Sequence, residues 1–177
     1  MTLLFRRFVG ALALSPDAFE DIEADRYADL QSMLVVVAVC LSGGFGAVAF
    51  GAAGAAGFAA GSILVLAGWL VWVGVIATVG TTSFAEPQTS SSVRELLRVL
   101  GYASAPGIFL GFAAIRPAAP IVILIVAAWM IAAAVIGVRQ ALDYKRTGRA
   151  IAVCAAALAI AAAMMAGVGL LFSTPVY

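Results

Sequence analysis

Two arginines, two tyrosines and one aspartate are the residues of this chain whose types and spacing come nearest to a chemical site. Arg98 and Tyr102 are four residues apart and share one face of a helix, and Arg139, Asp143 and Tyr144 stand together further along the chain. Side chains of this kind can surround a lipid phosphate. No nucleophile stands beside an activating base, so the set predicts an anionic-lipid site before a catalytic one.

The residues that most catalytic and metal chemistry requires are missing. The chain has no histidine, an essential member of Ser-His-Asp and Cys-His catalysis and of most zinc and haem sites. Cys40 and Cys154 stand alone in different apolar segments, which is typical of packing and not of a disulfide. The glycines at 43–46 have no lysine of a phosphate loop and indicate close helix packing. We therefore predict no enzyme activity, no metal and no cofactor.

The elements that must position such residues are membrane spans. The 177 residues are 64% hydrophobic and 11% charged, with a mean hydropathy of +1.12, whereas soluble domains are roughly 25% charged. Charged residues are absent from four long stretches, which are 30–85, 99–115, 117–138 and 150–177. A span needs about 20 residues, so the first stretch holds two spans and the others one each. We expect five spans, near residues 33–52, 62–82, 97–115, 120–140 and 150–172.

Basic residues orient these spans, because they are retained on the cytoplasmic side of a membrane. If the N-terminus is cytoplasmic, nine of the ten Lys and Arg residues fall on inside segments, and only Arg116 falls outside. The sequence thus predicts an all-α polytopic membrane bundle of five transmembrane helices, with the C-terminus outside. Residues 32–177 form this membrane domain, and the Gly/Ala run 51–61 is predicted to be the tight turn between the first two spans.

Residues 1–31 are predicted to form two helices at the cytoplasmic surface. The first places Leu3, Leu4, Phe8 and Leu12 toward lipid and its two arginines, Arg6 and Arg7, near the headgroups. Ser15 and Pro16 are typical of a helix start, so an acidic helix is expected over 15–31. Two alternatives remain for it: docking on the basic connection 139–149, or a solvated arm that leaves this connection to contact anionic headgroups.

The third span is unusually polar. Ser92 and Glu95 match a capping box, so its helix begins at Val93 and is expected to run on without a break. Only 17 residues separate Arg98 from Arg116, about 25 Å of helix, so both arginines must snorkel. Proline bends a helix, and small residues allow close contact. The span is therefore predicted to face other helices, through packing residues Gly101, Tyr102, Ser104, Pro106, Gly107 and Gly111.

These residues resemble those of a known family. Gly101 to Pro106 (GYASAP), which follows Arg94 to Arg98 (RELLR), is similar to the third-span signature of the Yip-type (Ypt-interacting protein) domain, as are Trp129 and the Gly148-Arg149-Ala150 entrance to the last span. The resemblance covers about residues 15–172 and implies five spans with a cytosolic N-terminus. Eukaryotic relatives bind Rab-type GTPases through an Asp-Leu-Tyr-Gly-Pro stretch that this chain lacks, so that binding is not expected here.

Two functions from different classes follow. The first is a non-enzymatic membrane scaffold or adaptor, whose partners are membrane lipids, other membrane proteins or a second copy of itself, and not nucleic acid. Its expected site for anionic lipid or a partner comprises Arg94, Arg98, Arg139, Asp143, Lys145, Arg146 and Arg149. The alternative is a small permease or lipid-translocating (scramblase-like) bundle that uses Tyr102, Ser104 and the Pro106 bend. One lysine against nine arginines, with abundant alanine, indicates a bacterial source and hence the inner membrane.

Overall fold

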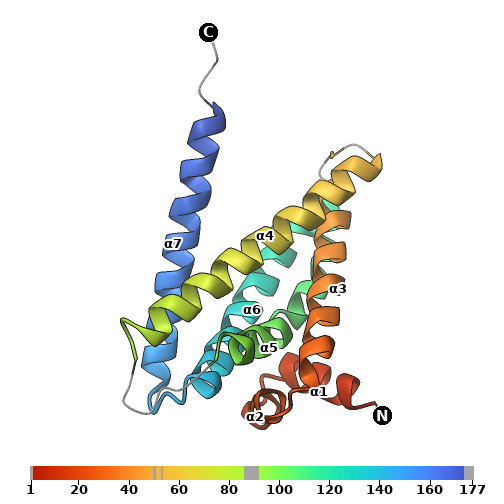
Figure 1. The fold of residues 1–177 in the computed structure, drawn as a ribbon. Coiled ribbons are helices and arrows are strands. Elements are labelled where there is room, and N and C mark those ends of the chain that lie inside the picture. The colour runs from red at the N-terminus through yellow and green to blue at the C-terminus, as the bar shows by residue number, and fades with distance from the viewer. Residues whose placement is uncertain (1, 50, 53, 86–91, 174–177) are drawn as a thin grey trace.

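The computed structural model describes residues 2–49, 51–52, 54–85 and 92–173. Within these ranges every regular element is a helix, and no strand occurs, which confirms the predicted all-α class (Figure 1). In chain order the elements are α1 (Leu3–Leu12), α2 (Pro16–Ala24), α3 (Ala28–Ala49), α4 (Gly54–Thr81), α5 (Val93–Ala103), the 3₁₀ helices η1 (Ala105–Ala114) and η2 (Arg116–Ala118), α6 (Ala119–Ala141) and α7 (Thr147–Ser173).

The long apolar helices lie where the charge-free stretches predicted them. Within the described residues, four helical segments are long and apolar enough to cross a membrane: 28–49, 54–81, 116–141 and 147–164. The pair α5 and η1 passes the same test when its two parts are taken together, which raises the count to five if the bent pair is one span. The chain is therefore a multi-pass helical membrane protein.

The third predicted span is bent, as Pro106 indicated, but it also changes helix type, where we expected one helix to run on without a break. α5 ends at Ala103, and η1 continues at an angle of 41° to it. Pro106 lies one residue inside η1. A proline has no N–H for the i−4 carbonyl, and its ring clashes with that carbonyl, so the α-helical pattern cannot pass through it. The proline decides where the span bends, as its position in the sequence indicated.

The first two spans are joined by a shorter turn than the Gly/Ala run predicted. α3 ends at Ala49 and α4 begins at Gly54, so most of the run 51–61 is helical, and the expected turn over all of it is wrong. The reason is close packing between the two helices. A Cβ atom on Gly61 would lie 2.5 Å from the Ala47 Cβ, so this glycine lets α4 lie against α3.

The acidic segment is one helix in the sequence-based prediction and two in the structure. α2 ends at Ala24, and α3 begins at Ala28, three residues before the expected domain boundary at 31/32. The Asp25 carboxylate accepts a hydrogen bond from the Tyr27 N–H at 2.9 Å. An aspartate that bonds to a backbone N–H two residues on stabilises a turn in place of a helix.

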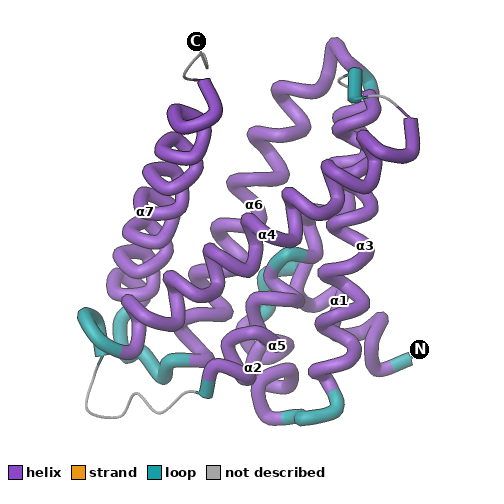
Figure 2. Tube along the Cα trace, turned by 45° about the horizontal axis from the view of Figure 1, so that its top comes forward, coloured by secondary structure: helices purple, strands orange, loops and turns teal. Residues whose placement is uncertain are grey.

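The helices form a bundle with one diagonal member. α4 packs on α3 near their shared turn and runs diagonally to pack on the lower part of α7, which stands on the opposite side of the bundle from α3 (Figures 1 and 2). α1 and α2 lie across the lower end of the bundle, where α3, α5 and α7 begin and α4 and α6 end. We call this end the charged end. Arg116 lies at the other end and donates to the Ala49 carbonyl at 3.0 Å.

Candidate functional site

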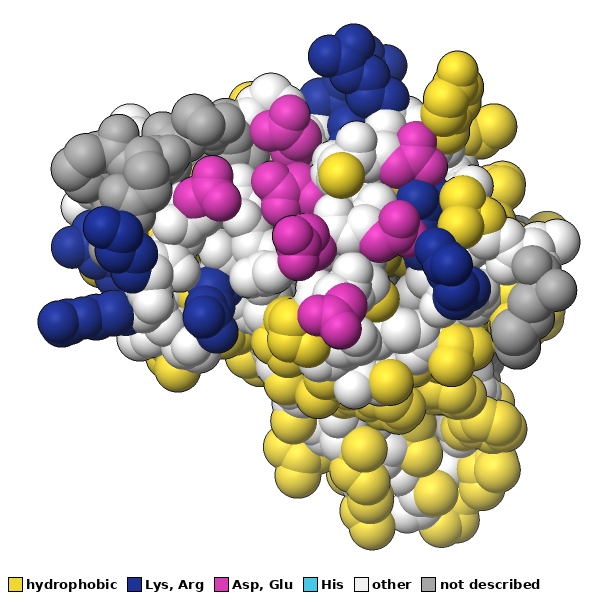
Figure 3. Space-filling model, turned by 90° about the horizontal axis from the view of Figure 1, so that it is seen from below, with side chains coloured by type: hydrophobic (Ala, Val, Ile, Leu, Met, Phe, Trp, Pro, Cys, Tyr) yellow, Lys and Arg dark blue, Asp and Glu magenta, His cyan; other side chains and the backbone are white. Residues whose placement is uncertain are grey.

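The charged end brings together polar side chains that the sequence distributes over the whole chain. Figure 3 shows its face, on which carboxylates gather near the middle, and Lys and Arg side chains lie to either side of them. Local sequence starts two of its helices as predicted: the Ser15 hydroxyl caps α2, and Ser92 and Glu95 form the expected capping box of α5. These caps fix the direction in which α2 and α5 present their charged residues.

Arg98 is buried in the protein, where we expected its side chain to snorkel to the membrane surface. Only 3% of the residue is exposed, and its Nε lies 2.6 Å from the Asp29 Oδ1. Its guanidinium also donates to the Glu23 carbonyl. Arg94 lies 2.8 Å from the other oxygen of Asp29, but most of its side chain is exposed. Arg98 therefore ties α5 to α3 and to the end of α2.

Arg7 is the second buried arginine, although we expected it near lipid headgroups. Its Nε lies 2.9 Å from the Asp21 Oδ2, and its Nη2 lies 2.8 Å from the Asp25 Oδ2. A third donor, Nη1, bonds to the Gln31 side-chain oxygen at 3.2 Å. A buried guanidinium is stable only with such a set of acceptors. Arg7 thus fastens α1 to α2 and to the start of α3.

Tyr102 meets Arg7 at a residue that the sequence did not single out. The phenol is fully buried and donates to the Gln31 side-chain oxygen at 2.8 Å, so Gln31 accepts from both residues. Gln31 stands in the first turn of an apolar helix, where a polar residue needs a partner. The position of Gln31 in an apolar helix was therefore the signal in the sequence that it has a partner. Only the fold shows that the partners are Arg7 and Tyr102.

The glycines of the predicted packing set lie against α3. A Cβ atom on Gly101 would lie 2.8 Å from the Ser32 Cβ, and one on Gly107 would lie 2.6 Å from a Val39 methyl group. Gly111 is next to Ser42, and Pro106 is fully buried. The Ser104 hydroxyl donates to the Gly101 carbonyl at 2.6 Å.

Hydroxyl groups inside the spans bond to backbone carbonyls. Ser62 and Thr78 donate to the carbonyls four residues before them, at 3.0 and 2.9 Å. Ser42 donates to the Ile108 carbonyl at 2.8 Å, which links α3 to η1. Together with the bonds of Tyr102 and Ser104, these contacts engage each hydroxyl that could have lined a polar path in the permease alternative.

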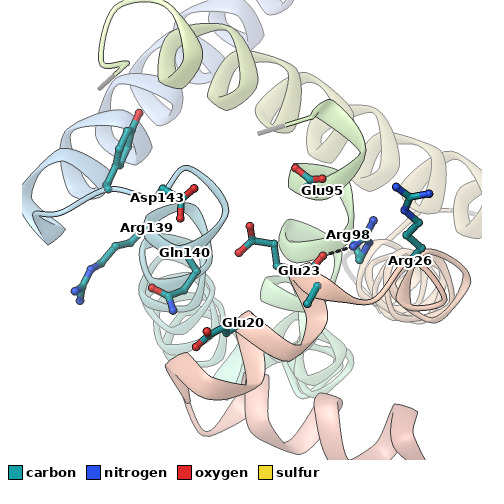
Figure 4. Close-up of a pocket in the computed structure, with 10 residues that line it drawn as sticks. Glu20, Glu23, Arg26, Glu95, Arg98, Arg139, Gln140 and Asp143 are labelled. Atoms are coloured by element: carbon teal, nitrogen blue, oxygen red, sulfur yellow. Dashed lines mark hydrogen bonds between the residues drawn. The ribbon is translucent and has the colours of Figure 1, made fainter. Parts of the chain in front are cut away.

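An open cleft of about 650 Å³ lies at the charged end between α2, α5 and α6. In Figure 4 the side chains of Glu23 and Asp143 point toward its middle, and that of Arg139 points away. α2 packs on α6, where its Phe19 ring lies beside Gly137. The acids Asp21, Asp25 and Asp29 form ion pairs with arginines, which are Arg6, Arg7, Arg94 and Arg98. Among the described residues, no ion pair joins α2 to the connection 139–149.

Carboxylates at the charged end differ in their electrostatic surroundings. Burial, together with the nearby Asp143 and Glu95 carboxylates, raises the pKa of Glu23 to about 7. The hydrogen bond from Arg7 holds the pKa of Asp21 below its ordinary range. The Tyr27 N–H, followed by Arg7, lowers the pKa of Asp25. Asp21 and Asp25 are thus held as anions, whereas Glu23 changes its charge near neutral pH.

The predicted lipid- or partner-binding residues fall into three places. Arg94 and Arg98 share Asp29, and Arg98 also reaches the cleft, which Arg139 and Asp143 line on the other side. Lys145, Arg146 and Arg149 line a separate shallow pocket at the start of α7. Arg149 donates to the Phe84 carbonyl at 3.1 Å. No group of three potential metal ligands occurs among the described residues.

These features define the class first: a multi-pass α-helical membrane protein with a charged end built around two buried arginines. A family model described as the Yip1 domain matches residues 9–168. Because that match spans most of the chain, the protein belongs to the Yip1 domain family, which confirms the resemblance found in the sequence. Searches of the curated proteins and of the solved structures found no match.

Proposed function

We propose that this protein is a non-enzymatic membrane adaptor that binds a partner protein at the charged end of its bundle. The observation that carries the proposal is the open cleft between α2, α5 and α6, lined by Glu20, Glu23, Glu95, Arg139 and Asp143. A surface with so many charges does not face lipid tails, since charges are expensive there. It suits a partner with complementary charges on its aqueous side.

Two further observations favour an adaptor. The buried arginines Arg7 and Arg98 hold α1, α2, α3 and α5 together, so the cleft is formed before any partner binds. A preformed surface binds with a smaller loss of conformational entropy. The intramembrane hydroxyls bond within the protein, which favours this function over the permease alternative.

The charged end belongs on the cytoplasmic side in this proposal, and the membrane is the bacterial inner membrane. The positive-inside rule supports the orientation, because the basic residues other than Arg116 lie on segments at this end. Lys145, Arg146 and Arg149 then face the headgroups of anionic lipids, with about 1 kcal/mol of attraction for each base. The lipid contact orients the bundle and adds to the contact with the protein partner.

Crosslinking in native membranes, followed by purification in mild detergent and mass spectrometry, tests the adaptor. We expect one reproducible protein partner, and we expect Glu20→Gln to reduce its recovery several-fold. Asp17→Asn is the matched control, because Asp17 is also an exposed acid of α2 but does not line the cleft. Equal recovery with both variants would move the binding site away from the cleft, and recovery of no partner would contradict the adaptor.

A further inference from the structure

A second cavity, of about 220 Å³, lies in the middle of the bundle. We call it the tryptophan cavity. It is lined by parts of α3, α4 and α6 near the middle of each helix, and by Ser104, which lies between α5 and η1. The residues used below are Cys40, Trp69, Trp72, Ser104 and Met130. α4 runs diagonally past α6 and packs on α3 and α7 (Figure 1).

Two residues that line this cavity carry a buried hydrogen-bond donor without an acceptor among the described residues. The indole N–H groups of Trp69 and Trp72 are buried, and neither has a partner among the described residues. Trp69 is only 8% exposed as a whole residue. The chain's third tryptophan, Trp129, donates to the Leu12 carbonyl at 2.9 Å. Since buried donors are nearly always paired, two orphans beside one cavity indicate an occupant that supplies acceptors.

The lining favours an apolar occupant over water. A buried water needs two to four polar partners, and its share of liquid volume is about 30 Å³, so a cavity of this size exceeds what one water fills. The only hydroxyl of the lining, on Ser104, already donates to the Gly101 carbonyl. Apart from Ser104, the two indoles and the Cys40 thiol, the lining residues are Val, Gly or Met. An apolar body that carries a hydrogen-bond acceptor fits this lining.

The depth of the cavity in the membrane further limits the kind of molecule that could occupy it. Cys40, Trp69 and Met130 each lie about half-way along a helix that crosses the membrane, so the cavity lies near the middle of the hydrocarbon. Ester carbonyls of a phospholipid are tethered to headgroups at the surface. No charged residue lines the cavity, which excludes pairing with an anion there. A neutral molecule dissolved in the membrane core meets these conditions.

We propose that the tryptophan cavity binds the carbonyl-bearing ring of a neutral, membrane-dissolved molecule of the isoprenoid quinone type. The indole N–H groups of Trp69 and Trp72 donate to carbonyl oxygens of the ring, and the flat indoles pack against it. Half-buried lining residues, among them Gly68, Trp72 and Met130, connect the cavity to the lipid-facing surface, through which the molecule enters. The proposal concerns binding alone and is independent of the adaptor function.

Equilibrium titration of the full-length protein with decylubiquinone tests this site. The protein is reconstituted in vesicles of ether-linked phosphatidylcholine, which contain no ester carbonyl, and bound quinone is measured against protein-free vesicles. We expect saturable binding of one quinone per chain and a higher melting temperature with quinone. Trp69→Phe keeps an aromatic six-membered ring but removes the N–H together with the rest of the indole, and we expect at least a tenfold loss of affinity. Trp129→Phe is the matched control, because its N–H is already paired, and affinity should stay within about twofold.

Two further experiments decide whether the tryptophan cavity binds a quinone or a phospholipid. Gly68 lines the cavity, and a Cβ atom added there meets nothing within 4 Å, so Gly68→Leu is compatible with the fold. We expect the leucine to narrow the cavity and to abolish the rise in melting temperature even if Trp69→Phe folds poorly. Vesicles of ester-linked phosphatidylcholine should give the same quinone affinity. Competition by the ester lipid would replace quinone with a phospholipid as the occupant and overturn the proposal. Unsaturable partitioning, or equal affinity of Trp69→Phe and Trp129→Phe, would overturn it as well.

Discussion

The charged end and the tryptophan cavity treat buried polar groups in opposite ways. At the charged end Arg7, Arg98 and Tyr102 are almost fully buried, and each bonds to side chains or carbonyls of other helices. In the tryptophan cavity, two buried indole N–H groups have no acceptor among the described residues. Paired groups stabilise one arrangement of helices, whereas unpaired donors leave binding energy for a ligand. The paired groups Arg7, Arg98 and Tyr102 fasten the helices to one another, and we call them the anchor. The cavity with its unpaired donors is a binding site.

The largest expected effect comes from removing a buried charge of the anchor. Arg98→Met keeps an unbranched apolar stem but leaves the Glu23 carbonyl and one Asp29 oxygen without their donor. We expect a loss of about 3 kcal/mol in the free energy of unfolding, measured by denaturing-detergent titration with circular dichroism. Arg94→Met is the control, because its ion pair with the same aspartate is mostly exposed, and should cost under about 1 kcal/mol. Equal losses would show that burial is not what makes this anchor strong.

The next effect tests the close contact that brings the anchor's helices together. Gly101→Ala places a Cβ atom 2.8 Å from the Ser32 Cβ, so α5 must move away from α3. We expect a loss of about 1–3 kcal/mol in the same titration. Gly74→Ala on α4 meets no atom within 4 Å and should be neutral or stabilising by up to about 1 kcal/mol. A neutral Gly101→Ala would contradict close packing at this position.

A smaller effect compares a paired and an unpaired polar group directly. Tyr102→Phe removes the hydroxyl that donates to Gln31, and we expect a loss of about 1 kcal/mol. Trp72→Phe removes an N–H that has no protein acceptor, so the ligand-free protein should lose no hydrogen-bond energy. Differential scanning fluorimetry of both variants in quinone-free vesicles measures the contrast. Because Trp→Phe also removes ring volume, Trp129→Phe is the reference for this variant: it loses the same atoms and a paired N–H, so it should cost about 1 kcal/mol more than Trp72→Phe. Equal losses in the two tryptophan variants would indicate an acceptor for the Trp72 indole.

The smallest effect concerns the cleft and depends on pH. The pKa of Glu23 is raised from 4.5 to about 7, so the folded state binds its proton more tightly, and wild-type stability falls as pH rises between these values. Glu23→Gln removes this loss. At pH 8 we expect the variant to be more stable by about 1 kcal/mol, after allowance for solvent screening at a half-buried site. At pH 4.5 or below the gain should vanish, and a gain that is the same at both pH values would contradict the titration of Glu23.

Much of the fold could be predicted from the sequence, because it depends on local properties. Charge-free stretches located the apolar helices, since length and hydropathy decide whether a helix can lie in a membrane. Ser15, Ser92 and Glu95 marked helix starts through bonds that reach only three residues. Pro106 marked the bend through its own missing N–H. Each of these signals acts within one or two turns of helix.

The partners of the buried groups could be found only in the tertiary structure. The sequence places Arg7 and Arg98 at predicted interfaces, where exposure and burial are equally compatible with local sequence. Arg98 and Asp29 are 69 positions apart, and Tyr102 and Gln31 are 71 apart. The sequence also gives no sign that Trp129 has an acceptor while Trp69 and Trp72 have none among the described residues. Local interactions determine helices and their ends, but the pairing of buried groups depends on which helix faces meet, and packing of the whole chain decides that.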